Sequence, residues 1–314
     1  MLSDRIFCLG HISVDIFISR ATLEETSTKI GGCIQSQDLV MCGGGDAANV
    51  AYWLAVKGRP VSFLGVIAKD PMGEFLRSDL EQVGVNCFLK QSQDYPTASI
   101  LAIIEPNGER SFVLNGESQN ELLWKDLPLT QMLQSSIIYT SAYTLEKDPV
   151  KSTMMRLFQH VKQQEKKSPE VIFNLASFTT VENCRDEIIK GILPFTDILI
   201  GNRDEFHLLV QHSVGFECSK VGLQLIKESP QLHTVLITDG ENGCYYVTKD
   251  MKGHITAPKI KVIDTTGAGD GFCAGFITGY TTLERDIPKS VELGVKLGSE
   301  ICKGFGARYS PIPF

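Results

Sequence analysis

From about residue 120 onward, short apolar runs alternate with longer amphipathic segments, and this alternation limits the folds open to the chain. The runs are typical of buried strands and the longer segments of helices. Strands are expected at Ile137–Tyr139, Val171–Phe173, Asp197–Ile200 and Val235–Thr238, with helices near 149–166, 184–191, 203–211 and 219–228. The pattern predicts an α/β fold with a central, mainly parallel sheet that has helices on both faces.

The first third of the chain adds strands to this pattern and indicates a second, smaller sheet. Ile6–Gly10 and Val61–Ala68 are apolar runs that extend the central sheet. Ala98–Ile104 and Arg110–Leu114 flank a turn sequence of Pro, Asn and Gly, which predicts a hairpin. With strand-like segments at about 16–20 and 33–41, the hairpin region 98–114 can form a small β-sheet that acts as a lid over a crevice.

Composition excludes several classes of function. The net charge of −7 argues against binding to nucleic acid or to anionic membranes, both of which need a basic surface. Nine cysteines, an odd number without a C-x-x-C pair, indicate reduced thiols rather than a disulfide framework or a zinc site. The chain shows neither the apolar segment of a signal peptide nor an apolar run of about 20 residues. A cytoplasmic location is expected.

The glycine-rich stretch from Asp264 to Gly271 carries the strongest indication of chemistry. We expect a strand before it, at Lys259–Ile263, and a helix after it, at Phe272–Tyr280. Its glycines can expose consecutive backbone N–H groups at the positive end of that helix, which is a site for an anion. Asp270 fits such a site if the anion is a phosphoryl group in transfer, because a carboxylate can then take the proton of the attacking hydroxyl. An aspartate that only caps the helix is the alternative.

A second glycine turn, Gly43-Gly44-Gly45-Asp46-Ala47-Ala48-Asn49, opens another helix. His11, Ser13 and Asp15 follow the first strand, where α/β proteins place ligands. Local hydrogen bonding is the favoured explanation for His11, whereas Asp15 lies between apolar residues and needs partners or a polyhydroxy ligand. The turn also matches a dinucleotide fingerprint, which is weak evidence alone, so a nicotinamide-dependent oxidoreductase is a distant alternative.

Two further polar pairs follow strands. Asn202 and Glu205 come after the run that ends at Ile200, and Thr238 and Gly240 come at the end of the next run. A helix N-cap with a first-turn acid explains the first pair, and a simple turn explains the second. In isolation both structural explanations are favoured over a ligand site.

Together these segments resemble the ribokinase-like (PfkB) family of carbohydrate and nucleoside kinases. The motifs in question are Asp264–Asp270, Gly44–Asn49, Asn202-x-x-Glu205 and Thr238-x-Gly240, in an order and spacing that match the family over essentially the whole length. The resemblance implies a ribokinase-like fold in a single domain over residues 1–314. It also implies an ATP-dependent sugar kinase that transfers the γ-phosphoryl group to a hydroxymethyl group of a small sugar.

The resemblance implies roles for individual residues. Asp270 would be the base, and the N–H groups of Gly267, Ala268 and Gly269 would hold the transferring phosphoryl group. ATP would be bound by Asn202, Glu205, Thr238 and Gly240, with Glu205 near a hydrated Mg²⁺. The acceptor would be bound by Asp15, Ser13, Gly44, Gly45, Asp46 and Asn49. A monovalent cation such as K⁺ would use Asp264, Thr266 and Ser310.

The sequence features that bear on the substrate disagree. Ser13 and Asp46-Ala47 differ from the residues of ribokinases, whereas the tail Gly306–Pro313 resembles theirs. Phe173–Ser177 and Asp197–Asn202 are similar to adenosine-kinase sequences, so a nucleoside kinase with the same mechanism is the main alternative. In sugar-kinase relatives the lids of two copies clasp each other, so a homodimer through the lid is expected here, with a monomer as the alternative.

Overall fold

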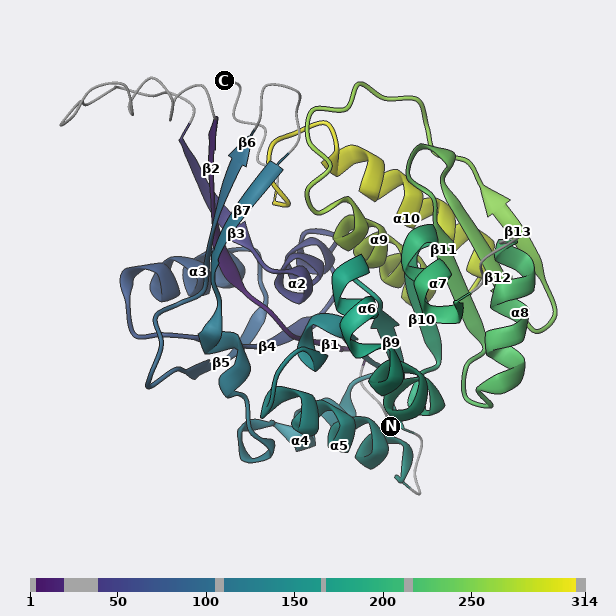
Figure 1. The fold of residues 1–314 in the computed structure, drawn as a ribbon, viewed down its shortest axis with the longest axis horizontal. Coiled ribbons are helices and arrows are strands. Elements are labelled where there is room, and N and C mark those ends of the chain that lie inside the picture. The colour runs from purple at the N-terminus through teal and green to yellow at the C-terminus, as the bar shows by residue number, and fades with distance from the viewer. Residues whose placement is uncertain (1–3, 20–38, 105–109, 165–167, 212–216, 309–314) are drawn as a thin grey trace.

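The computed structural model describes residues 4–19, 39–104, 110–164, 168–211 and 217–308. Its larger sheet has the strand order β13-β12-β11-β10-β9-β8-β1-β4-β5 (Figure 1). These strands are β1 (Ile6–Leu9), β4 (Val61–Ile67), β5 (Asn86–Gln91), β8 (Ile137–Ser141), β9 (Glu170–Asn174), β10 (Ile198–Asn202), β11 (Thr234–Thr238), β12 (Cys244–Thr248) and β13 (Lys252–Ile255). Only the pairs that involve β12 are antiparallel, so the predicted mainly parallel sheet is confirmed.

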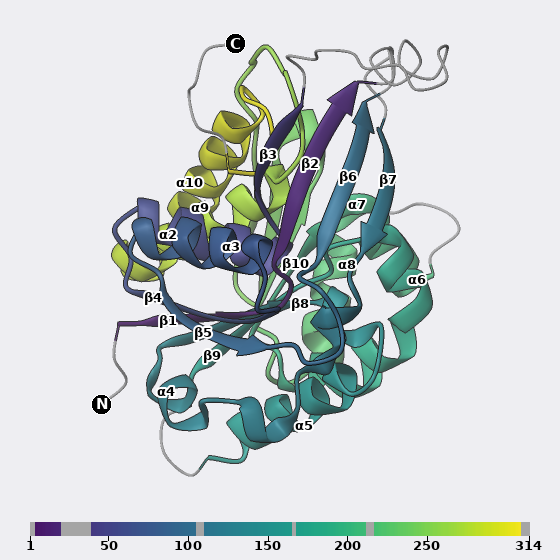
Figure 2. The same cartoon turned by 90° about the vertical axis from the view of Figure 1, so that its left-hand side faces the viewer.

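Helices cover both faces of this sheet, as Figure 2 shows. One face carries α2 (Asp46–Val56), α3 (Pro71–Gln82), α9 (Ala268–Thr282) and α10 (Ile287–Ile301). The other carries α4 (Leu129–Gln134), α5 (Val150–Lys162), α6 (Phe178–Glu187), α7 (Arg203–Val210) and α8 (Cys218–Glu228). Short 3₁₀ or π segments lie at Glu117–Glu121, Trp124–Asp126, Ala142–Leu145, Ile188–Ile192, Leu193–Phe195 and Gly240–Asn242.

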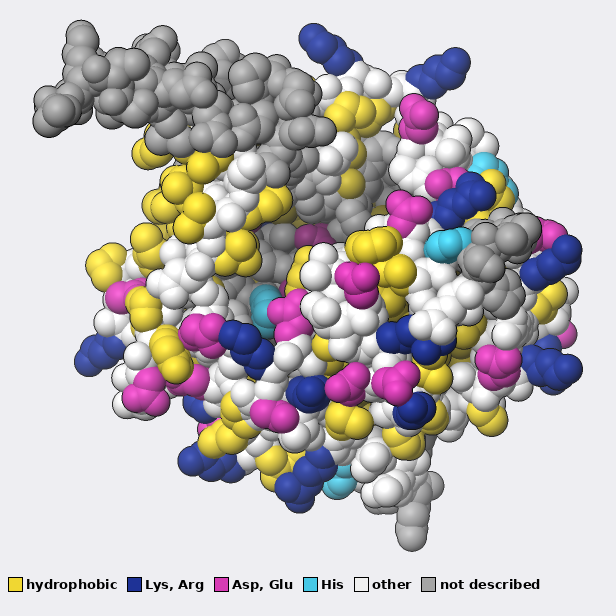
Figure 3. Space-filling model, in the orientation of Figure 1, with side chains coloured by type: hydrophobic (Ala, Val, Ile, Leu, Met, Phe, Trp, Pro, Cys, Tyr) yellow, Lys and Arg dark blue, Asp and Glu magenta, His cyan; other side chains and the backbone are white. Residues whose placement is uncertain are grey.

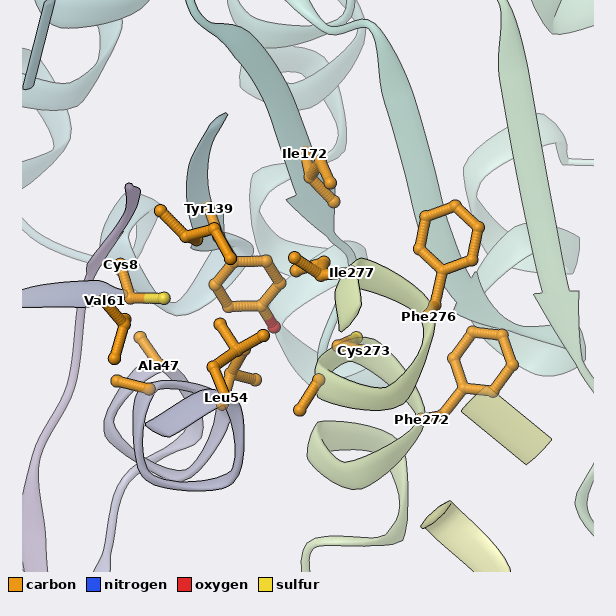
Figure 4. Close-up of a cluster of buried hydrophobic side chains, with 14 of the residues drawn as sticks. Cys8, Ala47, Leu54, Val61, Tyr139, Ile172, Phe272, Cys273, Phe276 and Ile277 are labelled. Carbon is orange, nitrogen blue, oxygen red and sulfur yellow. The ribbon is translucent and has the colours of Figure 1, made fainter. Parts of the chain in front are cut away.

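The strand β1 shows why the sheet is apolar throughout. Side chains alternate between its two faces, so Ile6 and Cys8 enter one hydrophobic cluster while Phe7 enters the other, and all are fully buried. In Figure 4, Cys8 and Tyr139 of the sheet meet Ala47, Leu54, Cys273 and Ile277 of α2 and α9. Burial of both faces requires near-continuous apolar runs, which is the pattern seen in the sequence.

A separate four-stranded sheet has the order β3-β2-β6-β7 and stands away from the larger one (Figure 1). Its strands are β2 (Ser13–Ser19), β3 (Val40–Gly44), β6 (Ser99–Ile104) and β7 (Arg110–Asn115). The side chain of Gln119 fixes the link between β1 and β2, because its amide bonds the N–H and the C=O of Ile12 at 3.0 and 2.9 Å. The four strands confirm the predicted small sheet. The expected strand residues 33–38 lie outside the described part of the chain.

Some sequence-based expectations are wrong. The strand expected at Lys259–Ile263 is an irregular segment in which Val262 and Ile263 are 53% and 52% exposed. Its backbone instead follows the end of α10, where the N–H of Ile263 bonds the C=O of Cys302 at 2.8 Å. The helix expected at Phe272 begins at Ala268 and therefore includes Ala268–Gly271, the second half of the glycine-rich motif.

Candidate active site

A cleft with a volume of about 680 Å³ lies between the small sheet and the carboxyl ends of the central strands (Figure 3). Residues from all the motifs line it, among them His11, Ser13, Gly45, Asp46, Asn202, Glu205, Thr238, Gly267, Gly269 and Asp270. Parallel strands place their carboxyl ends at one edge of the sheet, and this geometry brings together residues that are far apart in sequence. Four sequence motifs thus meet in one cavity.

The N-terminus of α9 forms one wall of the cleft. Gly267 caps the helix in a left-handed conformation with φ of 76°. A side chain at this position would overlap Ala307, so the close approach of the C-terminal segment also requires glycine. The N–H of Ala268 donates to the C=O of Thr265 at 3.2 Å, which leaves Gly267 and Gly269, both lining the cleft, as the better candidate donors to an anion.

Asp270 lies in the first turn of α9 and lines the cleft. Its Oδ2 accepts a hydrogen bond from Nδ2 of Asn49 at 2.8 Å. Burial, helped by the negative charge of Asp46, raises the pKa of Asp270 to about 7, although Asn49 and Arg308 both oppose this shift. A carboxyl group with such a pKa is suited to accept a proton near neutral pH.

Asp15 projects from β2 beneath the glycine turn. It is 8% exposed, accepts a hydrogen bond from Ser13 Oγ at 2.8 Å, and burial raises its pKa to about 6. A side chain on Gly44 would overlap this carboxylate, so the turn can pass over Asp15 only with glycine at that position. Asp15, Gly44 and Asn49 support the wall of the cleft and are not among the residues that line it.

Asp46 and His11 carry buried polar atoms that need partners. Within the described part of the chain, no hydrogen bond of regular geometry reaches Nε2 of His11 or either carboxylate oxygen of Asp46, although Ser141 and the backbone of Ala47 and His11 lie close enough to favour the ionised form of Asp46. Burial raises the pKa of Asp46 and lowers that of His11, and the two groups attract each other when both are charged. The expected local hydrogen bonding of His11 is thus wrong for Nε2; its ring instead stacks on Tyr143, with ring centroids 5.7 Å apart.

Asn202 and Glu205 form a complete capping box at the start of α7. The N–H of Glu205 donates to Asn202 Oδ1 at 2.9 Å, and the N–H of Asn202 donates to Glu205 Oε2 at 2.8 Å. The structural explanation of this pair is therefore confirmed. Both residues also line the cleft, and burial raises the pKa of Glu205, 4% exposed, to about 7.

The remaining predicted residues lie around the cleft. Thr238 lines it and bonds the C=O of Gly201 at 3.3 Å, while Gly240 begins a 3₁₀ turn and is not among the lining residues. Asp264 accepts hydrogen bonds from the backbone and side chain of Thr266 at 2.9 and 2.8 Å and from the N–H of Gly306 at 2.9 Å. Ser310, the third predicted cation ligand, lies outside the described residues.

Several lining residues were not among the sequence-based candidates. They are Gln119, Asn120, Tyr143, Glu146, Lys147 and Asn174. Asn174 ends β9 and Tyr143 follows β8, so their position after a parallel strand was a usable signal. Gln119 and Asn120 belong to a 3₁₀ segment that follows the small sheet, and no pattern in the sequence marked them.

The fold and the cleft define an α/β protein with a ligand site at the carboxyl edge of a parallel sheet, partly covered by a second sheet. Residues 3–313 match the family model described as pfkB family carbohydrate kinase. The chain belongs to this family, whose members are ATP-dependent phosphotransferases acting on sugars or nucleosides.

The chain is similar to proteins of both substrate classes. It is 29% identical over 252 residues to a probable fructokinase-5 of Arabidopsis thaliana, covering 77% of this chain and 75% of the relative. It is 27% identical over 314 residues to adenosine kinase of Saccharomyces cerevisiae, covering 96% and 85%. The crystal structure of adenosine kinase from Sinorhizobium meliloti has the same ribokinase-like fold, with a TM-score of 0.82 at 24% identity, covering 98% and 95%.

Two further observations concern membrane-spanning helices and the alternative of a nicotinamide-binding oxidoreductase. In the part of the chain that the structure describes, no helix has the length and apolar character needed to cross a bilayer. The turn Gly43–Ala48 follows β3 of the small sheet rather than a strand of the parallel sheet, and the guanidinium of Arg308 fills the space beside Gly43. The family assignment and this placement together remove the support for a nicotinamide-binding oxidoreductase.

The raised pKa of Asp270 predicts how the stability of the fold depends on pH. Folding raises this pKa from 3.8 to about 7, so the native state binds more protons than the unfolded chain between these values. Its contribution to stability therefore falls as pH rises through that window. We expect Asp270→Asn to melt roughly 1–4 °C higher than the parent, measured without ligands, at about pH 8, and the gain to shrink towards pH 5.

Asp286→Asn is the matched control for this comparison. Asp286 caps α10, and its lowered pKa places its titration below that of an ordinary aspartate, outside the pH range compared. Its effect on the melting temperature should be the same at both pH values. If Asp270→Asn raised the melting temperature by the same amount at both pH values, folding would not raise the pKa of Asp270.

Proposed function

We propose that this protein is an ATP-dependent sugar kinase that transfers the γ-phosphoryl group to a hydroxymethyl group of a small neutral sugar. The observation that carries the proposal is the position of Asp270, a carboxyl group with a pKa near neutrality in the first turn of a helix whose N-terminus lines the cleft. A base and an anion site thus lie within one turn of helix. Phosphoryl transfer to a hydroxyl needs both.

In the proposed reaction Asp270 accepts the proton of the attacking hydroxyl as the oxygen bonds to phosphorus. The backbone N–H groups of Gly267 and Gly269, together with the positive end of α9, stabilise the negative charge on the transferring group. Ala268 contributes less, because its N–H is already bonded in this structure. ADP leaves with the bridging oxygen, and Asp270 later releases its proton to solvent.

The nucleotide is placed on the side of Asn202, Glu205 and Thr238, with Gly240 at the edge of the cleft. Glu205 suits a site beside a hydrated Mg²⁺, because a cation next to a buried carboxyl group favours its ionised form. Mg²⁺ would neutralise charge on the phosphates of ATP. A K⁺ site is proposed at the loop of Asp264 and Thr266, with Ser310, whose support is the resemblance to ribokinases.

The acceptor is placed beside Asp15 and Asp46. No hydrogen bond of regular geometry within the described residues reaches the carboxylate of Asp46, so sugar hydroxyl groups can bond it, whereas Asp15 lies behind the glycine turn and accepts from Ser13. Three carboxyl groups, including Asp270, would repel a sugar acid. The pocket therefore favours a neutral polyol. Ser13, Gly44 and Gly45 are proposed to shape this subsite, and Asn49 to act mainly through Asp270.

A nucleoside kinase of the same mechanism is the alternative. The observation that favours it is the stacked pair of His11 and Tyr143, which lines the cleft and offers a flat aromatic surface to a base. The similarity to adenosine kinase of yeast agrees with this alternative. It requires no change in the roles of Asp270 or Gly267.

We also propose that residues 1–314 form one domain in which the small sheet serves as a lid. Leu114 and Ile100 of this sheet line the cleft, so a movement of the sheet would open or close it. The opposite face carries the apolar residues Val113, Leu101 and Met41 in neighbouring register positions. Figure 3 shows hydrophobic side chains gathered on this sheet. A cytoplasmic location is part of the proposal and agrees with the free thiols of the described cysteines.

The apolar face predicts a homodimer through the lid. Val113 is 59% exposed, and burial against a second copy would remove it from water. In sedimentation analysis the protein should be a dimer that Val113→Asp shifts towards monomer. Met251→Asp, at a residue that is 48% exposed and lies between β12 and β13 at the far edge of the larger sheet, should leave the dimer intact. A monomeric parent protein, or equal effects of both variants, would contradict this interface.

The substrate class is tested by measuring ADP release from Mg-ATP with furanose and ketose sugars, sugar acids, adenosine and inosine, each with and without K⁺. We expect turnover with a neutral sugar and none with a sugar acid. Asp46→Ala should lower kcat/KM for that sugar by roughly tenfold or more, because a hydrogen bond to a charged group is lost. Turnover with nucleosides alone would establish the alternative, and no turnover with any acceptor would contradict the proposed function.

A further inference from the structure

The side-chain amide of Asn49 connects the candidate base to a buried arginine. Its Nδ2 donates to Asp270 Oδ2 at 2.8 Å, and its Oδ1 accepts from Nε of Arg308 at 3.0 Å. A guanidinium group can only donate hydrogen bonds, so it must face the oxygen of the amide. The nitrogen is thereby directed at the carboxylate of Asp270. One orientation of the amide satisfies both neighbours, and the opposite orientation satisfies neither.

Arg308 is itself held on every side. Its Nη2 donates to the C=O of Gly44 at 2.9 Å, and its Nη1 forms a close ion pair with Asp79 of α3. The guanidinium lies over the ring of Tyr52, 5.5 Å from its centroid. Arg308 is only 5% exposed, and a side chain on Gly43 would overlap it. A cation fixed by α2, α3 and the glycine turn has little freedom to move.

The residues that precede Arg308 contact both the turn before α9 and the helix α2. The N–H of Gly306 donates to Asp264, and the indole N–H of Trp53 donates to the C=O of Ala307 at 2.8 Å. Ala307 also packs directly against Gly267, the N-cap of α9. Residues 306–308, here called the C-terminal strap, therefore contact the anion-site turn on one side and the acceptor-side helix α2 on the other.

We propose that Arg308 is a positioning residue for phosphoryl transfer, which holds the amide of Asn49 so that it supports the carboxylate of Asp270. The inference rests on the proposed function, in which Asp270 is the base. Arg308 is not among the residues that line the cleft, so it acts on the reaction through Asn49. It links the base to the backbone of the small sheet at Gly44, and thus ties the geometry of the base to the position of the lid.

The charge of Arg308 adds a measurable signature. Arg308 stabilises the ionised form of Asp270, whereas Asp46 of α2 and Asp15 of β2 oppose it. Asp270 also interacts with Tyr139 of β8, with Cys273 of α9 and with Tyr143 of the 3₁₀ segment Ala142–Leu145. Removal of the guanidinium removes a nearby cation and loosens a hydrogen bond to the carboxylate. Both changes raise the pKa of Asp270.

The test compares Arg308→Gln and Arg308→Lys with the parent enzyme, on the acceptor that the panel identifies. For Arg308→Gln we expect kcat to fall by about 10- to 100-fold with KM for ATP nearly unchanged. The acidic limb of the pH profile of kcat/KM should move to higher pH. Arg308→Lys keeps the charge but not the planar fork, so its limb should stay near that of the parent while kcat remains reduced.

Arg285→Gln is the matched control. Arg285 also pairs with a carboxylate, Glu170 at 2.6 Å, and lies over an aromatic ring, Tyr280, but it contacts no residue of the cleft. Its replacement should change neither kcat nor the pH profile. A shift of the acidic limb in Arg308→Gln that is absent in Arg285→Gln separates positioning of the base from a general loss of stability.

Two outcomes would overturn the inference. In the first, Arg308→Gln has the kcat and pH profile of the parent while Asp270→Asn is inactive. This result would contradict the role of Arg308 but leave the proposed function intact. The other applies if Arg308→Gln does not fold: Arg308→Lys with the parent's kcat would then show that the fork geometry is not needed. An active Asp270→Asn enzyme would instead contradict the proposed function itself.

Discussion

The site depends on a carboxyl group held where it is costly to ionise. Asp270 is at the start of α9, near Asp46 and Asp15, and burial raises its pKa to about 7. Three features lower this cost: the positive end of the helix, the hydrogen bond from Asn49 and the positive charge of Arg308. The resulting balance keeps the group able to gain and lose a proton near neutral pH. The segments packed around Asp270 maintain this balance.

Three segments far apart in sequence meet to provide it. The glycine turn after β3 carries Asn49 and passes over Asp15, the start of α9 carries Asp270, and the C-terminal strap brings Arg308 between them. Glycine is needed where they touch, because a side chain at Gly44 or Gly267 would overlap its neighbour. The lack of a side chain at these two glycines is what lets the three segments, and the charged groups that they carry, come this close.

The sequence predicts the central sheet well because burial on both faces leaves a strong signal, as β1 shows. It fails where the signal is weak or misleading. The apolar pair Val262 and Ile263 suggested a strand but is exposed, and β5 (Asn86–Gln91) was missed because this edge strand mixes polar and apolar residues. α10 was also not predicted.

The candidate site was predictable to the extent that it lies in glycine motifs and after strands. The sequence placed Asp270, Glu205 and Asp46 in one site, and the structure brings them to one cleft. It could not show that the amide of Asn49 joins Asp270 to Arg308, because that contact spans 259 positions on one side and 221 on the other. Side-chain hydrogen bonds between distant segments leave no pattern in a single sequence.

The central claim is that Asp270 acts as the base of a phosphoryl transfer. The most direct measurement compares Asp270→Asn with the parent protein for binding of ATP, by calorimetry, and for ADP release with the preferred acceptor. The account predicts ATP binding of similar strength and turnover lowered by at least about 100-fold, since a general base is lost while the anion site remains. Turnover at the rate of the parent would contradict it.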